Sequence, residues 1–257
     1  ASGNRRNYFF IALLAAASLA VLLFHLAAMG HVDWPARAGL QVGLDLVLFI
    51  VAVIGGRVIP MFTNNGVPGA GATRHAWVER ASLGGLLALL ALDAAGVGGA
   101  PLAVLALATA VAHGARLWLW RPLRTLRTPL VWVLHAAYAW IVVHLVLRAL
   151  AQWGQVAEPL ALHALTIGVI GGMTIGMMTR TSRGHTGRPL AADRFEVACY
   201  GLVQLAAVTR VLGGLAAPDW YLHTVVASGV FWSLAFAIYA VRYWPVLTRP
   251  RVDGKPG

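Results

Sequence analysis

Residues 160–190 read LALHALTIGVIGGMTIGMMTRTSRGHTGRPL, and this stretch indicates what kind of protein the chain is. Residues 160–179 carry no formal charge and are numerous enough for one helical crossing of a bilayer. Small residues recur at every fourth position and form a smooth stripe that a second helix can approach closely: Ala164, Gly168, Gly172 and Gly176. The pattern predicts a tightly packed membrane-spanning helix that runs into a basic loop at 180–194.

The whole chain has the composition of a membrane protein. It has 257 residues, of which 59% are hydrophobic and 11% charged, and its mean hydropathy is +0.73, whereas a soluble domain carries roughly 25% charged residues. The single cysteine, Cys199, excludes an internal disulfide and a four-cysteine metal site within one chain. The sequence has no Walker-type phosphate loop and no dinucleotide-binding glycine motif. These features exclude soluble enzyme folds and suggest no nucleotide-driven function.

Eight apolar runs predict an all-α polytopic bundle of about eight spans, in a single transmembrane domain that covers residues 1–257. The runs are about 8–29, 38–59, 82–99, 101–119, 130–150, 160–179, 197–217 and 221–243. The glycines and proline of residues 96–101 predict a tight turn between the third and fourth runs. One broken or re-entrant element is the alternative for this region.

The net charge of +11 follows the predicted topology and does not require nucleic acid as a partner. With eight spans, nearly every Arg and Lys falls on one side, which holds both chain ends and the segments 60–81, 116–129 and 180–196. The exceptions are Arg37, Arg148 and Arg210. The positive-inside rule predicts that this side, with both termini, is cytoplasmic. Tryptophans near the span ends fit an interfacial belt in a lipid bilayer.

Five histidines lie inside spans or near their ends: His25, His113, His135, His144 and His163. Of these, His135, His144 and His163 are the candidate metal ligands. A histidine in hydrocarbon is costly unless it faces the bundle interior and finds a partner, and neutral imidazole ligates both haem iron and copper. His135 and His144 are nine residues apart, half a turn out of phase on a helix, so they cannot bind one metal ion together. For each histidine, a hydrogen bond between helices is the alternative.

Two further groups inside the predicted spans could carry chemistry. Met173 and Met177 share a helix face, and their thioethers suit Cu(I) or haem iron, with ordinary packing as the alternative. Asp45 lies within the second span, where a carboxylate predicts a proton relay, a cation site or an ion pair. We expect its partner to be a His or Arg on another helix, and a protonated structural Asp45 is the alternative.

Basic side chains at the end of the sixth span could bind an anion: Arg180, Arg183, His185 and Arg188, together with Arg57 from the second span. Guanidinium groups bind carboxylates and phosphates in a bidentate manner, so haem propionates or lipid headgroups are suitable ligands. We expect such a site where residues 55–66 meet residues 180–190. A loop that only fixes the orientation in the membrane is the alternative.

Three stretches together are similar to the signature of a known family. HALTIGVIGGMTIGMMTRTSRGHTGRPL, GGRVIPMFTNNG at 55–66 and PLVWVLHAAYAW at 129–140 resemble the NnrS family of bacterial polytopic membrane proteins, described as containing haem and copper and linked to nitric-oxide stress. The resemblance implies haem and copper as cofactors, an inner-membrane location, and correspondence to the C-terminal portion of longer relatives. It also singles out these positions: Arg57, Pro60, Asn65, Gly66, His135, His163, Arg180, Gly184, His185, Gly187 and Arg188.

Three functions are therefore compared. The first, which the resemblance favours, is a haem and copper membrane protein in the response to nitric oxide or nitrosative stress, with nitric oxide or another small molecule as its ligand. The second is a transporter or channel in which Asp45 and the intramembrane histidines relay protons or bind a cation. The third is a non-catalytic assembly protein that binds a partner, or a second copy of itself, through Gly168, Gly172 and Gly176. The sequence does not establish turnover of a substrate.

Overall fold

The computed structural model describes residues 8–254, and its regular secondary structure is entirely helical. The long elements are α1 (Tyr8–Ala28), α2 (Ala36–Gly66), α3 (Ala76–Ala94), α4 (Ala100–Leu119), α5 (Pro129–Gln152), the continuous α6 (Glu158–His163), η3 (Ala164–Gly171) and α7 (Gly172–His185), α8 (Arg194–Ala216) and α9 (Tyr221–Leu247). Short 3-10 turns are η2 (Pro122–Thr125) and η4 (Pro218–Trp220). Among the described residues, seven helices are long and apolar enough to cross a membrane. The expected polytopic all-α bundle is confirmed.

The third and fourth apolar runs form separate helices. α3 begins at Ala76, earlier than the run at 82–99 indicates. It is followed by a turn in which Gly96 and Gly99 have φ values of 68° and 74°, a region that glycine enters without a steric penalty. α3 contacts both α2 and α4, and this turn separates α3 from α4, as the glycines and proline predict. α3 is less apolar than the seven candidate membrane spans because it contains three charged residues: Glu79, Arg80 and Asp93.

Two helices extend further than the apolar runs indicate. α2 continues through Pro60 to Gly66, and α7 continues to His185, so residues 180–185 are helical and the expected loop is confined to 186–193. An uncharged run marks where a hydrocarbon environment can end, but it does not mark where helical hydrogen bonding ends. Arginine is a good helix former, and its charge is favourable at a helix C-terminus.

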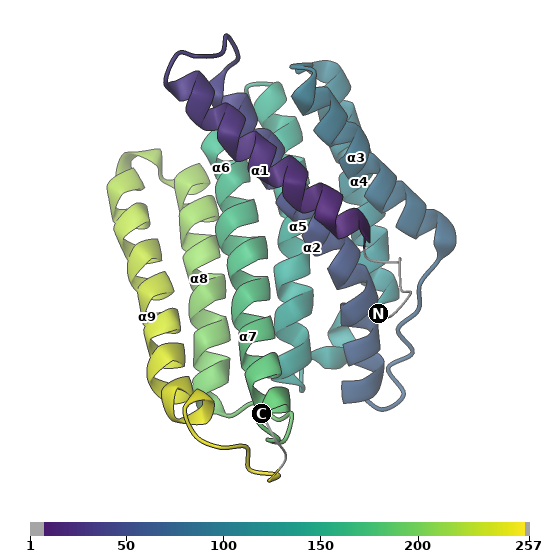
Figure 1. Cartoon of the computed structure of the whole chain (residues 1–257), viewed down its shortest axis with the longest axis vertical. Helices are drawn as coiled ribbons and strands as arrows, with labels where there is room; N and C mark the ends of the chain where they lie inside the picture. Colours follow the sequence, from purple (N-terminus) through teal and green to yellow (C-terminus); the bar gives the residue numbers. More distant parts are fainter. Residues whose placement is uncertain (1–7, 255–257) are drawn as a thin grey trace.

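α5 is the central helix of the bundle. It is buried along most of its length and contacts α2, α4, α7 and α8. Figure 1 shows α1 running obliquely across the front, with α8 and α9 at one edge. Only Ala20 of α1 is buried, so this helix is the one most exposed to the surroundings of the bundle.

The stripe of small residues packs within the chain. A Cβ atom added at Gly168 would overlap the Trp140 ring, and one added at Gly172 would lie 2.7 Å from the Cβ atom of Ala137. Gly176 also faces α5. The prediction that Gly168, Gly172 and Gly176 bind a partner or a second copy is therefore wrong, because α5 already fills this groove.

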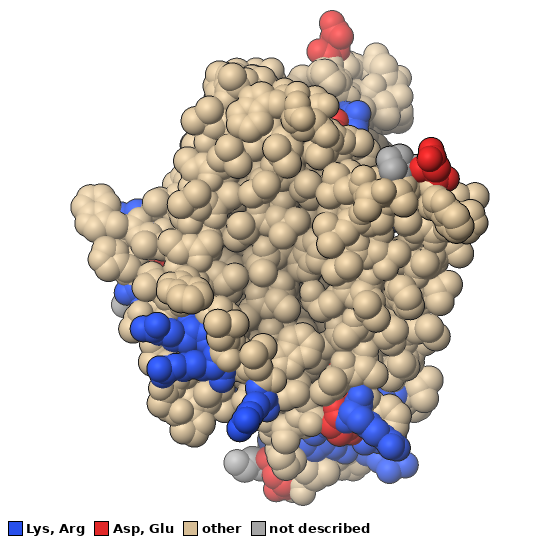
Figure 2. Space-filling model, turned by 180° about the vertical axis from the view of Figure 1, so that it is seen from behind, with Lys and Arg blue, Asp and Glu red and all other residues tan. Residues whose placement is uncertain are grey.

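The charges gather toward one end of the molecule. Figure 2 shows a broad band of uncharged side chains, with most of the visible Arg below it. We call this the basic end; it comprises the connections 67–75, 120–128 and 186–193 and the segment 248–254 after α9. Residues 1–7, whose Arg5 and Arg6 contribute to the predicted orientation, lie outside the described residues. The alternation of helices between two ends identifies a multi-pass membrane protein.

Candidate functional site

A buried histidine lies where α2 meets α5. His135 is 3% exposed, and its Nε2 is 2.8 Å from the Thr63 hydroxyl oxygen. Thr63 donates its own hydrogen to the Ile59 carbonyl, so its oxygen accepts the hydrogen of His135 Nε2. The lone pair is then on Nδ1, which is buried and has no hydrogen-bond partner among the described residues. Such an oriented imidazole presents a free nitrogen that suits a metal.

A buried arginine contacts the residue of α2 that precedes Thr63. Arg180 on α7 is only 8% exposed, and its guanidinium carbon is 3.7 Å from the centre of the Phe62 ring. Phe62 directly precedes Thr63, so Arg180 and His135 contact consecutive residues of α2. No carboxylate pairs with Arg180 within residues 8–254. A buried guanidinium without an anion is costly, which makes this position suitable for a carboxylate ligand.

His144 is held in a comparable way on the other side of α5. Its Nδ1 donates to the Ala161 carbonyl oxygen at 2.7 Å, because a carbonyl can only accept. Its Nε2 therefore carries the lone pair, and this atom is buried without a partner in the described chain. The two imidazoles contact α2 and α6 respectively, as their half-turn offset predicts.

The candidate metal-binding side chains are single residues that do not form a cluster in the described part of the chain. In the part of the chain that the structure describes, no three His, Cys, Asp or Glu side chains are placed to hold one metal ion. His163 is half-buried at the end of α6, and His185 is exposed. The unpaired nitrogens of His135 and His144 are each suited to ligate haem iron or copper. No cluster within residues 8–254 supplies the remaining ligands.

Met173 and Met177 line one cavity, as their spacing predicts. The cavity has a volume of about 230 Å³ and lies between α2, α5 and α7. Its walls are apolar apart from Thr174, and they include Ile59 and Leu134, which contact or adjoin the residues around His135. The cavity therefore has room for a small uncharged molecule, and no imidazole or carboxylate lines it.

Asp45 is part of an ion-pair network near the opposite end. Arg148 on α5 contacts Asp45 Oδ1 at 3.1 Å and Asp93 Oδ2 at 2.6 Å, and Gln41 donates to Asp45 Oδ1 at 2.9 Å. The expectation that Asp45 pairs with a His or Arg on another helix is confirmed. One guanidinium serves two carboxylates, and Asp45 Oδ2 is buried without a partner among the described residues.

The remaining basic residues do not gather in one place. Arg57 is exposed and lies 5.9 Å from the Phe9 ring of α1, so the expected site joining Arg57 to Arg183 and Arg188 is wrong. Helical spacing explains the separation, because Arg57 lies six residues, nearly two turns, before Thr63 on α2. Arg183 and Arg188 instead face α8 and α9.

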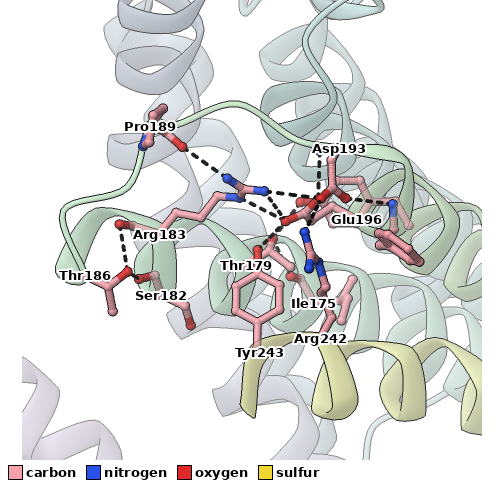
Figure 3. Close-up of polar contacts among 12 residues, drawn as sticks. Ile175, Thr179, Ser182, Arg183, Thr186, Pro189, Asp193, Glu196, Arg242 and Tyr243 are labelled. Carbon is pink, nitrogen blue, oxygen red and sulfur yellow. Dashed lines mark hydrogen bonds and ion pairs between the residues drawn. The ribbon is translucent and has the colours of Figure 1, made fainter. Parts of the chain in front are cut away.

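Arg183 and Arg188 line a separate basic cavity of about 380 Å³ between the ends of α7, α8 and α9. Figure 3 shows Arg183 directed at Glu196, which it contacts through Nε at 2.9 Å, while the Tyr243 hydroxyl donates to the same carboxylate at 2.7 Å. Asp193 is the N-cap residue of α8 (Arg194–Ala216) and forms a reciprocal capping box with Glu196. The pKa of Asp193 lies well below its ordinary range, first because of hydrogen bonding with the Glu196 side chain and then because Phe195 N–H and Arg242 donate to it.

A family model described as NnrS protein matches residues 1–251. This chain belongs to the NnrS family. The comparisons with curated proteins and with solved structures found no match. In this NnrS protein, the three stretches that carry the family signature meet in space: Thr63 of 55–66 contacts His135 of 129–140, and Phe62 packs against Arg180 of 160–190.

Sequence reasoning missed a second buried network in this NnrS protein. Arg116 on α4 contacts Glu79 on α3 through two hydrogen bonds of 2.8 and 2.6 Å and donates to the Tyr138 hydroxyl at 2.8 Å. His113 Nδ1 lies 2.7 Å from the same hydroxyl, and its Nε2 donates to the Ser82 carbonyl. Every nitrogen of His113 is satisfied, so this network is structural. No local motif marks it, because its members come from three helices.

Glu196, Tyr243 and Arg242 were also not predicted as parts of a site. The sequence Asp193-Arg194-Phe195-Glu196 is a capping-box pattern at the start of an apolar run, and this pattern could have located Glu196 beside the basic loop. The arginines near the end of α9 were assigned only to the charge bias of the basic end.

Proposed function

We propose that this NnrS protein binds haem or copper and acts in the response to nitric oxide or nitrosative stress, in the bacterial inner (cytoplasmic) membrane with both termini in the cytoplasm. Family membership supports the nitric-oxide context, and the gathering of Arg at one end supports the orientation. The observation that carries the proposal is a buried imidazole with a free nitrogen and a buried arginine without a carboxylate among the described residues, which contact consecutive residues of α2.

Haem carries a partner for each of these two side chains: an iron ion for the imidazole of His135 and a propionate carboxylate for the guanidinium of Arg180. In our proposal, His135 would ligate the haem iron through Nδ1 and Arg180 would neutralise a propionate carboxylate. Thr63 fixes the His135 tautomer by accepting from Nε2, and Phe62 supports the Arg180 plane. A metal centre, when bound, supplies a redox-active ion that can take a small diatomic ligand.

His144 is the second proposed metal ligand. Its Nδ1–H···O=C bond to Ala161 is the kind of outer contact that orients metal-bound imidazoles. His163, at the end of α6, remains a candidate metal ligand. Met173 and Met177, which line the cavity between α2, α5 and α7, remain candidate copper ligands. That cavity also offers nitric oxide, a small uncharged molecule, a place between the helices.

Absorption and metal analysis of the detergent-purified protein test this proposal. We expect a Soret band that shifts on reduction and on addition of nitric oxide, or bound copper. His135→Ala should lower the haem content and Arg180→Gln should weaken retention of haem, whereas loss of copper alone in His144→Ala would assign that residue to copper. His25→Ala, at an exposed histidine of α1, is the matched control.

A protein that stays colourless and copper-free when produced with haem and copper supplied would contradict the proposal. Equal metal content in the His135, His144 and His25 variants would contradict the residue assignments while leaving metal binding intact. The two results are distinguishable because the first is measured on the unmodified chain.

Proton- or cation-coupled transport is the second candidate, and the Asp45 network favours it. Two carboxylates share Arg148, and Asp45 Oδ2 has no partner in the described chain, so this group could exchange a proton or hold a cation. A transport function predicts pH-driven uptake into proteoliposomes that Asp45→Asn abolishes. Uptake that is equal in both proteins, or absent in both, would contradict it.

A further inference from the structure

Two hollows adjoin each other at the basic end, and they differ in chemistry. The basic cavity is lined by four arginines: Arg183, Arg188, Arg242 and Arg249. The neighbouring groove has a volume of about 540 Å³ and apolar walls formed by Phe195, Ala237, Ile238 and Val241. Arg242 and Pro245 line both hollows, so the cavity and the groove share a border.

The basic cavity carries more positive charge than its own acids neutralise. Glu196 accepts from Arg183, and Asp193 contacts Arg242 at 3.0 Å. These two carboxylates leave an excess of two positive charges among the four arginines. Arg188 Nη1 is buried without a hydrogen-bond partner among residues 8–254, and Arg249 has no ion pair in the same range. A phosphate bears the charge and the acceptor oxygens that these guanidinium groups lack.

The groove lies on the outer surface of a membrane-spanning helix. Val241 of α9 is 78% exposed and Trp244 is 72% exposed. Exposed tryptophan near the end of a span is typical of the membrane interface. In a bilayer this groove therefore contacts acyl chains, and the basic cavity lies at the level of the headgroups. A soluble anion would use only the cavity, whereas a lipid would use both hollows.

We propose that the ends of α7, α8 and α9 form a binding site for an anionic phospholipid. The headgroup phosphate binds Arg188 and Arg249 in the basic cavity, and an acyl chain lies along the groove between Phe195 and Val241. Basic pockets between transmembrane helices are suited to such headgroups. The site is distinct from the residues proposed to bind haem or copper, and it does not depend on them.

Native mass spectrometry of the delipidated protein in detergent tests the proposal, with phosphatidylglycerol and phosphatidylcholine of the same chain length as probes. We expect retention of phosphatidylglycerol over phosphatidylcholine. Arg188→Gln and Arg249→Gln should each weaken phosphatidylglycerol binding by about fivefold. Arg127→Gln is the matched control, since Arg127 is exposed at the same end but lines neither hollow. Equal losses in all three variants would overturn the site in favour of general surface charge.

A second pair of measurements separates a lipid from a free anion. Ala237→Trp fills the groove while every arginine of the basic cavity is retained, and it should weaken binding of the long-chain lipid. Inorganic phosphate should compete poorly. If Ala237→Trp binds phosphatidylglycerol normally and inorganic phosphate displaces it fully, the basic cavity is a soluble-anion site and the proposal is wrong. Elution as a single species shows that each variant is folded.

Discussion

Arg116 on α4 holds Glu79 on α3 through two hydrogen bonds of 2.8 and 2.6 Å, and the arginine side chain is only 1% exposed. This pair attaches α3 to the bundle, and α3 lies outside the seven described helices that are long and apolar enough to cross a membrane. The packing of α3 against α4 therefore depends on a polar contact as well as on apolar burial.

Arg116→Leu should destabilise the protein by about 3 kcal/mol, because it removes the buried partner of Glu79 and leaves that carboxylate compensated only by the exposed Arg74. The double variant Arg116→Leu, Glu79→Leu should recover much of the loss, since removing both charges removes the uncompensated one. Thermal unfolding in detergent measures both. Equal destabilisation in the single and double variants would contradict this account.

The Arg148 network predicts an asymmetry between its members. Arg148→Met leaves two buried carboxylates facing each other and should cost about 3–5 kcal/mol. Asp45→Asn should have little effect or be stabilising, because Arg148 keeps Asp93 and the carboxylate excess disappears. Thermal unfolding of the two variants checks the order, and a greater loss in Asp45→Asn would show that the pair with Asp45 dominates.

Substitution in the small-residue stripe should act on the fold of the single chain. Gly172→Leu places side-chain atoms against Ala137 and should destabilise by about 1–3 kcal/mol or more. Gly229→Leu on α9 is the control, since an added Cβ there meets nothing within 4 Å. Size-exclusion chromatography with thermal unfolding distinguishes the effects. A stable Gly172→Leu protein with a changed oligomeric state would contradict the packing seen here.

Asp193 should stabilise α8 in a pH-dependent way. Its folded-state pKa is lowered, so its contribution is complete above the ordinary aspartate pKa of about 4 and declines as the pH falls through the folded-state value. Asp193→Ala should therefore cost about 1 kcal/mol at neutral pH through loss of the cap. The difference in melting temperature between the two proteins should narrow in strong acid, and a constant difference would show that charge is not involved.

The sequence predicts the helices well and their mutual contacts only in part. Uncharged runs are long enough to identify spans, but the helix ends lie beyond them because Arg180 and Arg183 can continue a helix. The cost of a buried charge predicts a His or Arg partner for Asp45, and the structure supplies Arg148. The rotation of α2 that separates Arg57 from His135 depends on packing, which no single stretch specifies.

The same limit applies to the candidate site. His135 and Arg180 stand out by residue type, but only the folded chain brings them to consecutive residues of α2. The contact between Arg116 and Glu79 has no sequence signal at all, because each residue alone is typical of a charged span end.

The π-helical turn at Ala164–Gly171 sets the phase of everything that follows it. A π-helical turn takes up one residue more than an α-helical turn, so an α-helical segment one residue shorter would present α7 at nearly the same angle. A deletion in the α-helical part that follows, between Gly172 and Thr179, would instead turn Arg180 away from Phe62 by about 100°. Single-residue deletions should therefore be tolerated better within Ala164–Gly171 than in the α-helical turns after it.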